Sequence, residues 1–322
     1  RAWQLVAPAE LVANSCLFVM GSEGRGEQLL KTDQDNGLIL RDGYAPPADL
    51  DAICARFSQA LADFGYPECP GRIMVSNPDW RAPLAEFSRQ LREWLILPDP
   101  DSLMKLAIFM DAHAVCGDAG LLRQAREAVL ALAPDNQAVL ARFASAITAF
   151  GESQGWWNKL FSLGEADSGL DLKKEGIFPL VHGVRSLALA HQVRATSTAA
   201  RVQALVGLGA LSPGEGEDLA EALHVFMALK LKAGLAEQEQ ARPVSGTVVV
   251  QQLSSLDRDL LKDALGVVKR FQQLLRTRLL SFGLVLGVGF ALGGRDQGEV
   301  FEQEVDQAAA GEGGVLIGGV GF

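Results

Sequence analysis

Apolar and polar residues alternate in blocks along the first forty positions of the chain. An apolar run covers 16–20, a polar and glycine-rich loop follows it, and a second apolar run covers 38–40. Short apolar runs bounded by glycine are typical of buried strands. This part of the pattern therefore predicts two strands joined by a long polar loop.

Apolar residues at helical spacing cover most of the remaining chain. In its first part they predict helices over 8–14, 49–64 and 84–95. The run 103–110 is more continuously apolar, and we interpret it as a further strand with Asp111 at its end. Later helices are predicted over 121–132, 138–150, 177–194, 199–208, 218–234 and 256–278. A mixed first part followed by a run of helices favours an α+β fold.

The length of 322 residues is enough for two domains, each with its own hydrophobic core. We expect a first domain over 1–132, a helical domain over 133–278 and an atypical glycine-rich tail over 279–322. The tail is apolar but too short and too often broken by glycine for a membrane span, and we expect no membrane span. We interpret it as an aberrant terminus or as an interaction tail.

Composition narrows the class of partner. The net charge of −10 argues against a nucleic-acid substrate, because phosphate backbones are bound through basic faces. It is compatible with a protein or small-molecule acceptor. The four cysteines are scattered without a Cys-x-x-Cys pair, which excludes the usual zinc motif. We interpret them as the reduced thiols of a cytoplasmic protein.

Two carboxylates precede the second predicted strand. Asp33 and Asp35 are two residues apart, so on an extended backbone their side chains point to the same side, about 7 Å apart. Two like charges held that close repel each other, and a divalent cation offsets the repulsion. Oxygen ligands of this kind suit Mg²⁺. Taken alone, however, an Asp-x-Asp after a glycine loop is more often a solvated turn.

The order of the glycines excludes two common phosphate-binding motifs. A P-loop needs Gly-x4-Gly-Lys followed by Ser or Thr, and Lys31-Thr32 comes too late for that spacing. A dinucleotide fingerprint needs Gly-x-Gly-x-x-Gly, whereas Gly21, Gly24 and Gly26 have the order Gly-x-x-Gly-x-Gly. A different kind of phosphate loop is therefore needed to explain this segment.

The assembly of strand, Gly21-Ser22, ten residues, Asp33-x-Asp35 and strand resembles the signature of the DNA polymerase β-like nucleotidyltransferase superfamily. The fuller string GSEGRGE…TDQDN is similar to the uridylyltransferase domain that modifies the PII signalling protein. It is more similar still to the nucleotidyltransferases found behind cyclic-nucleotide-binding and CBS domains. The resemblance implies a polymerase β-like nucleotidyltransferase domain followed by an all-α helical bundle that binds substrate. The segments 170–173 and 256–262 resemble parts of that second domain.

The resemblance also implies an activity and a metal site. A Mg²⁺-dependent enzyme, with Mn²⁺ as an alternative metal, would move a nucleoside monophosphate from a nucleoside triphosphate to a hydroxyl group of an unknown protein acceptor. Uridylyl or adenylyl transfer with a signalling role is expected. Asp33 and Asp35 would hold the metal against the triphosphate, and Asp111 would complete a second metal position. His113 replaces the arginine of the family's Asp-Ala-Arg, so the contact of that arginine is not expected here.

Four further residues are implied to bind the nucleotide. Gly21 and Ser22 would lie against the triphosphate, because glycine lets the backbone approach closely and supply N–H donors. Arg25 is the natural partner for a phosphate oxygen, since its guanidinium donates several hydrogen bonds in a fixed fork. Lys31 is the weaker candidate for the same role.

Two other classes of function stay open beside the enzyme. One is a non-catalytic nucleotide sensor that keeps the pocket and signals through the helical domain. The other is a protein-interaction module in which the Gly-Ser loop and Asp-x-Asp are relics. Three retained carboxylates favour the enzyme, because a relic has no physical reason to keep them.

Two smaller expectations complete the sequence analysis. The chain begins at Arg1 rather than Met, so we expect a piece of a longer protein. The resemblance implies upstream regulatory domains of the cyclic-nucleotide-binding or CBS type. His182, Arg185 and His191 share one predicted helix, and we interpret them as surface or packing residues rather than ligands.

Overall fold

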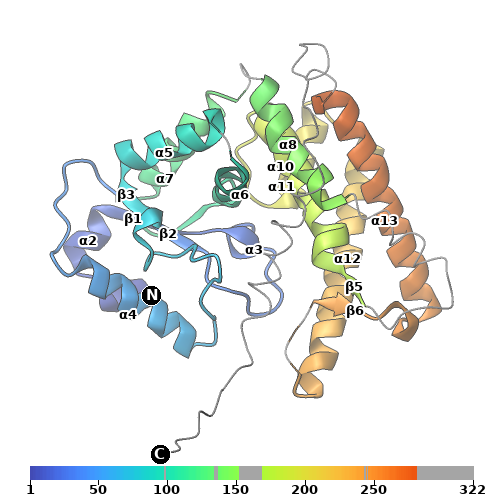
Figure 1. Ribbon diagram of the computed structural model, residues 1–322, viewed down its shortest axis with the longest axis horizontal. Helices are drawn as coiled ribbons and strands as arrows, with labels where there is room; N and C mark the ends of the chain where they lie inside the picture. Colours follow the sequence, from blue (N-terminus) through green and yellow to red (C-terminus); the bar gives the residue numbers. More distant parts are fainter. Residues whose placement is uncertain (98, 134–136, 152–168, 243, 245, 281–322) are drawn as a thin grey trace, which may run out of the picture.

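The computed structural model describes residues 1–97, 99–133, 137–151, 169–242, 244 and 246–280. All but the first two residues of the predicted glycine-rich tail lie outside the described residues. The first part of the chain forms a sheet with helices, and a mostly helical second part lies beside it (Figure 1). The protein therefore has the predicted α+β fold.

Four strands form the central sheet, in the order β3-β2-β1-β4. They are β1 (Ser15–Val19), β2 (Asn36–Leu40), β3 (Arg81–Pro83) and β4 (His113–Gly117). β1 is antiparallel to both β2 and β4, and β2 is parallel to β3. Val19 at the end of β1 stands opposite Asn36 on one side and His113 on the other. The end of β1 and the beginnings of β2 and β4 thus lie at one edge of the sheet.

Helices cover both faces of this sheet. They are α1 (Ala2–Val6), α2 (Ala9–Ala13), α3 (Gly21–Gly24), α4 (Leu50–Asp63), η1 (Pro78–Trp80), α5 (Leu84–Ile96), α6 (Pro100–Phe109) and α7 (Ala119–Leu130). Successive residues of a strand point to opposite faces. Leu17 and Leu38 accordingly pack with Trp3 of α1 and Phe57 of α4 in one core cluster. The rings of Trp3 and Phe57 meet edge to face, with their centroids 5.3 Å apart.

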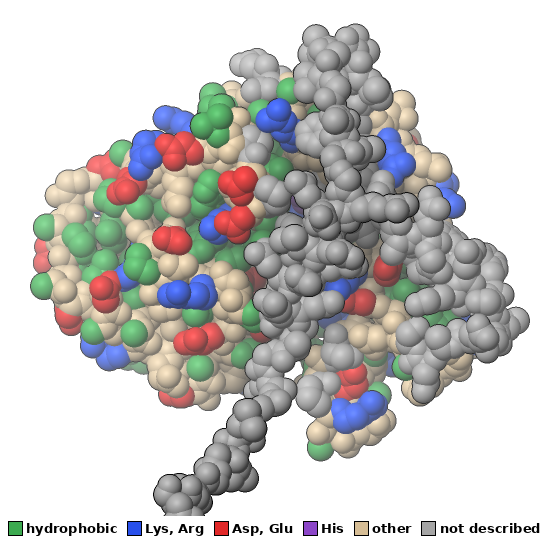
Figure 2. Space-filling model, in the orientation of Figure 1, with side chains coloured by type: hydrophobic (Ala, Val, Ile, Leu, Met, Phe, Trp, Pro, Cys, Tyr) green, Lys and Arg blue, Asp and Glu red, His purple; other side chains and the backbone are tan. Residues whose placement is uncertain are grey.

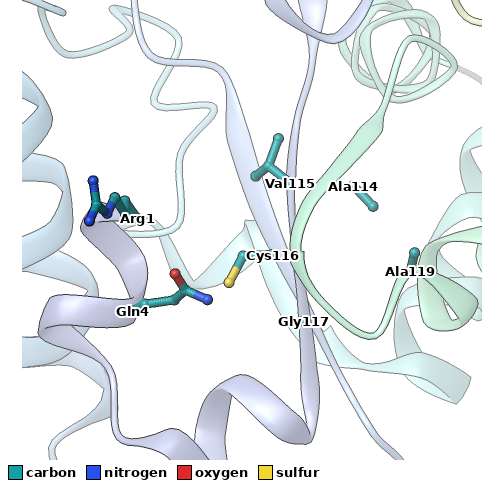
Figure 3. Close-up of a pocket in the computed structure, with 7 residues that line it drawn as sticks. All are labelled: Arg1, Gln4, Ala114, Val115, Cys116, Gly117 and Ala119. Carbon is teal, nitrogen blue, oxygen red and sulfur yellow. The ribbon is translucent and has the colours of Figure 1, made fainter.

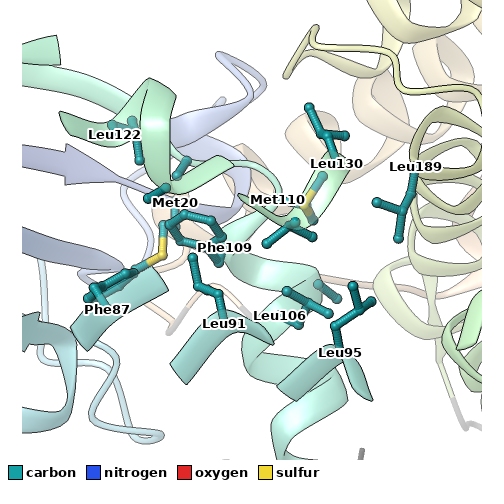
Figure 4. Packing of buried hydrophobic residues seen from close by; sticks show 14 of the residues in the cluster. Met20, Phe87, Leu91, Leu95, Leu106, Phe109, Met110, Leu122, Leu130 and Leu189 are labelled. Atoms are coloured by element: carbon teal, nitrogen blue, oxygen red, sulfur yellow. The ribbon is translucent and has the colours of Figure 1, made fainter. Parts of the chain in front are cut away.

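The opposite face of the sheet carries a larger core. Phe18 of β1 lies edge to face with Phe87 of α5 and with Phe109 of α6, at 5.9 Å between centroids in each pair. Leu189, which belongs to the second part of the chain, joins the same cluster near Leu130 of α7 (Figure 4). The two parts of the chain are therefore held together by shared apolar packing.

The second part consists mainly of long helices around a core of its own. Its elements are α8 (Gln137–Gly151), β5 (Leu170–Asp171), η2 (Lys173–Ile177), α10 (Phe178–Ala190), α11 (Thr198–Gly207), α12 (Pro213–Glu239), β6 (Thr247–Val248), η3 (Val250–Gln252), α13 (Ser255–Leu275) and η4 (Arg276–Leu280). A capping box begins α12, in which Ser212 and Glu215 each accept a hydrogen bond from the other's backbone N–H. The short antiparallel pair β5–β6 was not predicted from the sequence.

One predicted strand is wrong. The residues from 100 to 109 form helix α6, and the strand β4 begins only after Asp111. A continuous apolar run does not by itself distinguish a buried helix from a strand. The start of α6 is fixed by a capping box between Asp99 and Ser102 and by Pro100 in the first turn. β4 lies at the edge of the sheet, and its residues are exposed or half-buried, so it has no apolar run to reveal it.

We expect Gly37→Ala to lower the free energy of unfolding by about 1–3 kcal/mol, because it overpacks the core. A methyl group at this position of β2 would lie 2.3 Å from Cζ of Phe18, whose ring is held between two other aromatic rings. Urea unfolding measures the change. Gly207→Ala on α11 is the control, because a methyl group there meets no atom within 4 Å. Equal effects of the two substitutions would contradict this account of the core.

Candidate active site

The site is built where three segments meet at one edge of the sheet. Gly21 follows the end of β1, Asp35 precedes β2, and Asp111 precedes β4. The backbone N–H of Met20 donates to the carbonyl of Asp35 at 2.8 Å, which extends the pairing of β1 and β2 by one residue. The antiparallel pairing of β1 with both neighbours is the reason that these distant segments come together.

Gly21 allows the loop backbone to approach Asp35 closely. Its φ of +58° lies in the left-handed region, which side-chain-bearing residues rarely adopt. A methyl group on Gly21 would lie 2.7 Å from Oδ2 of Asp35. Glycine is therefore required here for two independent reasons, and the turn lies directly against Asp35.

Along the segment before β2, more exposed side chains alternate with buried ones, as expected for an extended backbone. Gln34 and Asn36 are buried, and Asn36 accepts a hydrogen bond from the backbone N–H of Val75 at 2.9 Å. Gln34 donates from Nε2 to the carbonyls of Ser58 and Tyr66. Asp33 is exposed and Asp35 is half-buried. Because the amides are turned inward at alternate positions, the two carboxylates are left on the other side of the segment.

The environment of Asp35 disfavours its ionised form. Burial raises the pKa of this carboxyl to about 6, a hydrogen bond from the Cys69 thiol acts in the opposite direction, and the charge of Asp33 raises the pKa further. Burial also raises the pKa of Asp33 and of nearby Glu23. A divalent cation would relieve the cost of ionising these groups.

The carboxylate pair fits Mg²⁺ as a donor set. Mg²⁺ is usually bound by one or two carboxylates, several waters and substrate phosphates, rather than by an all-protein cage. Asp33 and Asp35 supply two carboxylates on one side of an extended segment. Within the described part of the chain, no group of three or more His, Cys, Asp or Glu residues is arranged to hold a metal ion. The third carboxylate, Asp111, is thus not brought together with Asp33 and Asp35.

Asp111 lies instead at the centre of three arginines. Arg25 donates to Oδ2 at 2.6 Å, Arg185 donates to both oxygens at 3.1 and 2.5 Å, and Arg201 donates to Oδ1 at 2.7 Å. The side chain of Asp111 is completely buried. Burial alone would raise its pKa, but the three guanidinium groups outweigh burial and hold the pKa well below its ordinary value.

This network joins the two parts of the chain. Arg185 lies on α10 and Arg201 on α11, whereas Asp111 and Arg25 belong to the first part. Arg25 also binds Glu27 at 2.6 Å, and Glu27 accepts a hydrogen bond from the backbone N–H of Thr198, the first residue of α11. The polar network therefore anchors the loop after β1 to the helical part.

A neutral histidine extends the network. His182 is buried, its Nε2 lies 2.7 Å from the carbonyl of Phe143, and its Nδ1 lies 3.0 Å from a guanidinium nitrogen of Arg185. Nε2–H therefore donates to the carbonyl and Nδ1 accepts from the arginine. Burial and then the charge of Arg185 lower the pKa of His182 to about 3. The expectation that this histidine is a packing residue rather than a ligand agrees with these contacts.

The two cations predicted to bind phosphate are already engaged. Arg25 is held by Asp111 and Glu27. Lys31 donates a hydrogen bond to the carbonyl of Phe64, and its ammonium lies 5.6 Å from the centroid of the Tyr66 ring. Neither side chain is directed by these contacts toward the carboxylate pair. Ser22 lies half-buried in α3, directly after Gly21.

Two lysines that sequence reasoning did not select lie in this region, Lys173 near the carboxylate pair and Lys230 near Lys173. The positive charge of Lys173 lowers the pKa of both Asp33 and Asp35, in opposition to burial. Lys230 of α12 lies close to Lys173 and to Arg25. Burial lowers the pKa of Lys230, and the positive charges of Lys173 and Arg25 lower it further. The signal for Lys173 was present in the motif-like segment 170–173. No pattern in the sequence marks Lys230, because a lysine on a long helix is usually a solvated residue.

A separate hollow lies at the outer edge of the sheet (Figure 3). It is lined by residues of α1 and β4 and the turn after it, including Gln4, Val115 and Cys116. None of the predicted site residues lines it.

On the face of the first part shown in Figure 2, acidic and basic side chains are interspersed. In the described part of the chain, the helices are too short or too polar to cross a membrane.

Two protein families match the chain. Residues 1–101 match the family described as "Putative nucleotidyltransferase DUF294". Residues 137–279 match the family described as "Putative nucleotidyltransferase substrate binding domain". A comparison with curated proteins found no significant match.

We expect Asp111→Asn to lower the free energy of unfolding by about 3–5 kcal/mol, because it leaves buried guanidinium groups without their counter-charge. The lowered pKa means that this stabilisation is complete at neutral pH and is lost only in strong acid. Urea unfolding at neutral pH measures the loss. Asp218→Asn is the matched control, because Asp218 forms an exposed pair with Arg270 and is expected to change stability by less than about 1 kcal/mol. A loss as small as that of the control would contradict the anchoring role of Asp111.

Asp35→Asn should have the opposite effect on the stability of the ligand-free protein. Folding raises the pKa of Asp35 from its ordinary 3.8 to about 6, so the ionised carboxylate opposes folding above that pH. We expect a gain of about 1–3 kcal/mol near pH 7, at 1.36 kcal/mol per pKa unit. The gain should shrink as the pH falls through this range, where the native carboxyl becomes protonated. Urea unfolding over a pH series measures it, and a gain that does not depend on pH would contradict the account.

Proposed function

The chain belongs to this nucleotidyltransferase family, and we propose that it transfers a nucleoside monophosphate from a nucleoside triphosphate to a hydroxyl group of a protein. The observation that carries the proposal is the pair Asp33 and Asp35, both costly to ionise without a cation, with the Asp35 carboxylate against the tight turn at Gly21. The family supports nucleotidyl transfer. The hydroxyl acceptor and the signalling role are our proposals.

In the proposed reaction, the acceptor hydroxyl oxygen attacks the α-phosphorus of the nucleotide. The bond from that phosphorus to the oxygen bridging to the β-phosphate breaks, pyrophosphate leaves, and the hydroxyl proton passes to solvent. Asp33 and Asp35 would hold Mg²⁺ or Mn²⁺, which would neutralise charge on the triphosphate. Gly21 and Ser22 let the loop backbone lie against the phosphates.

Asp111 has a positioning role in this proposal. Three guanidinium groups occupy its oxygens, so it fixes Arg25 and the helical part relative to the carboxylate pair. Its earlier assignment as a ligand for a second metal stays a prediction. The described contacts support the positioning role, because releasing Asp111 would leave Arg185 and Arg201 without a carboxylate partner and Arg25 with Glu27 alone.

A second candidate function is a nucleotide sensor without turnover. It is favoured by the placement of Asp111, which leaves two carboxylates rather than three on the metal side of the site. Release of pyrophosphate distinguishes the two functions, because a sensor binds the triphosphate without breaking it.

Two further proposals concern organisation and location. We propose that residues 1–132 bind the nucleotide and residues 133–278 bind the acceptor, as the second family match supports. We also propose a cytoplasmic location, which agrees with the four free thiols of Cys16, Cys54, Cys69 and Cys116.

The test is calorimetric binding of ATP, UTP, GTP and CTP in the presence and absence of Mg²⁺. We expect one triphosphate to bind in a Mg²⁺-dependent manner, and Asp35→Asn to weaken it about tenfold or more, which is about 1.4 kcal/mol. Asp259→Asn is the control, because Asp259 is an exposed residue of α13 in the helical part.

The outcomes separate the functional classes. Binding of one triphosphate that is weakened only by Asp35→Asn supports the site, and the base is then known. Pyrophosphate release on addition of acceptor-containing extract supports transfer over sensing. Absence of binding for all four triphosphates, with no effect of the substitution, would overturn the proposed function in favour of an interaction module.

A further inference from the structure

We infer that Lys173 and Lys230, both from the helical part of the chain, bind the β- and γ-phosphates of the nucleotide opposite Asp33 and Asp35. The inference rests on the proposed function, because it names residues that complete the same site. It assigns nucleotide binding to the helical part, in addition to its expected role toward the acceptor.

The loop that carries the carboxylates is packed directly on α12. A methyl group built on Gly234 of α12 would lie 2.5 Å from Cδ1 of Leu30, so the Leu30 side chain rests on the helix backbone at that point. Lys230 is four residues before Gly234 and therefore lies on the same face of the helix, one turn away. This spacing places Lys230 on the side of α12 that faces the loop between β1 and β2.

Lys173 is fixed to the same region by the short sheet. Asp171 of β5 pairs with Thr247 of β6, and its carboxylate accepts hydrogen bonds from the backbone N–H groups of Lys173 and Lys174 at 2.8 and 3.2 Å. A methyl group on Gly246, next to that pair, would lie 3.6 Å from Cε of Lys230. The backbone of Lys173 and the side chain of Lys230 thus both lie next to the β5–β6 pair.

The charges around these lysines are only partly compensated. Among the described residues, neither ammonium group forms an ion pair, although Lys173 is close enough to act on the charges of Asp33 and Asp35. Lys230 is half-buried beside two other cations, Lys173 and Arg25, and one carboxylate, Asp171. Lys173 is exposed, and two neighbouring ammonium groups that form no ion pair within the described part of the chain favour binding of an anion.

The arrangement favours the triphosphate over an acidic surface of the acceptor protein. A metal held by Asp33 and Asp35 would contact phosphate oxygens on one side, and the ammonium groups would then contact the remaining oxygens on the other. Near but unpaired opposite charges are expected if a metal-bound phosphate lies between them. Lysine ammonium groups bind phosphates as point charges, which suits this role.

The test compares Lys173→Gln and Lys230→Gln with the unaltered protein in calorimetric binding of the preferred triphosphate and of the matching monophosphate, with Mg²⁺. We expect each substitution to weaken the triphosphate about tenfold and to leave the monophosphate within about twofold, because the monophosphate lacks the two outer phosphates. Lys232→Gln is the matched control, since Lys232 lies on the same helix but is exposed and paired with Asp257. Thermal unfolding checks that each variant is folded.

The outcomes distinguish this inference from the proposed function. If the unaltered protein binds a triphosphate and both lysine variants bind it equally well, the inference is wrong and the proposed function stands. If the variants lose transfer to the acceptor while triphosphate affinity is unchanged, the lysines contact the acceptor instead, and the phosphate assignment is overturned. If the unaltered protein binds no triphosphate, the proposed function fails and the inference fails with it.

Discussion

The ion network around Asp111 is the constraint on which the rest of the structure depends. One fully buried carboxylate is held by three guanidinium groups, one from the loop after β1 and two from α10 and α11. Buried charges are costly unless they are paired and hydrogen-bonded, so each member needs the others in place. Because the members come from both parts of the chain, the first part and the helical part are required to keep one relative arrangement. Apolar packing of Leu189 against the core of the first part acts in the same direction.

Because this arrangement is fixed, the first part of the chain forms one side of the candidate site and the helical part forms the other. The antiparallel pairing of β1 with β2 and β4 brings the Gly21 turn beside Asp35. The packing of Leu30 on Gly234 then sets the same loop against the face of α12 that carries Lys230. A family of nucleotidyltransferases with a separate substrate-binding domain needs some such juxtaposition, because the nucleotide and its acceptor must meet at one place. Here the contact is made by the loop that carries the carboxylates.

Asp111 and Asp35, at this edge of the sheet, have opposite effects on the stability of the ligand-free protein. Asp111 is stabilised in its ionised form by the arginines and helps to hold the fold together. Asp35 is destabilised in its ionised form by burial and by Asp33, so it is kept at a cost to the ligand-free protein. Residues kept at a cost to stability are concentrated at functional sites, since the strain is relieved when the ligand binds. This difference in environment, rather than proximity in sequence, separates Asp35, which we propose to be functional, from Asp111, which holds the two parts of the chain together.

The sequence by itself determined the local features of this protein. The helices at apolar spacing, the strands β1 and β2, the Gly21 turn and the alternation of Asp33 with Gln34 all follow from patterns within a few residues. Only the tertiary structure decided what those features face. Asp111 is bound by arginines 74 and 90 residues away, Arg25 and Lys31 are engaged by other groups, and Lys173 lies near the carboxylate pair with Lys230 beside it. Pairings at such separations depend on how strands pair and helices pack, and no local pattern of residues encodes them.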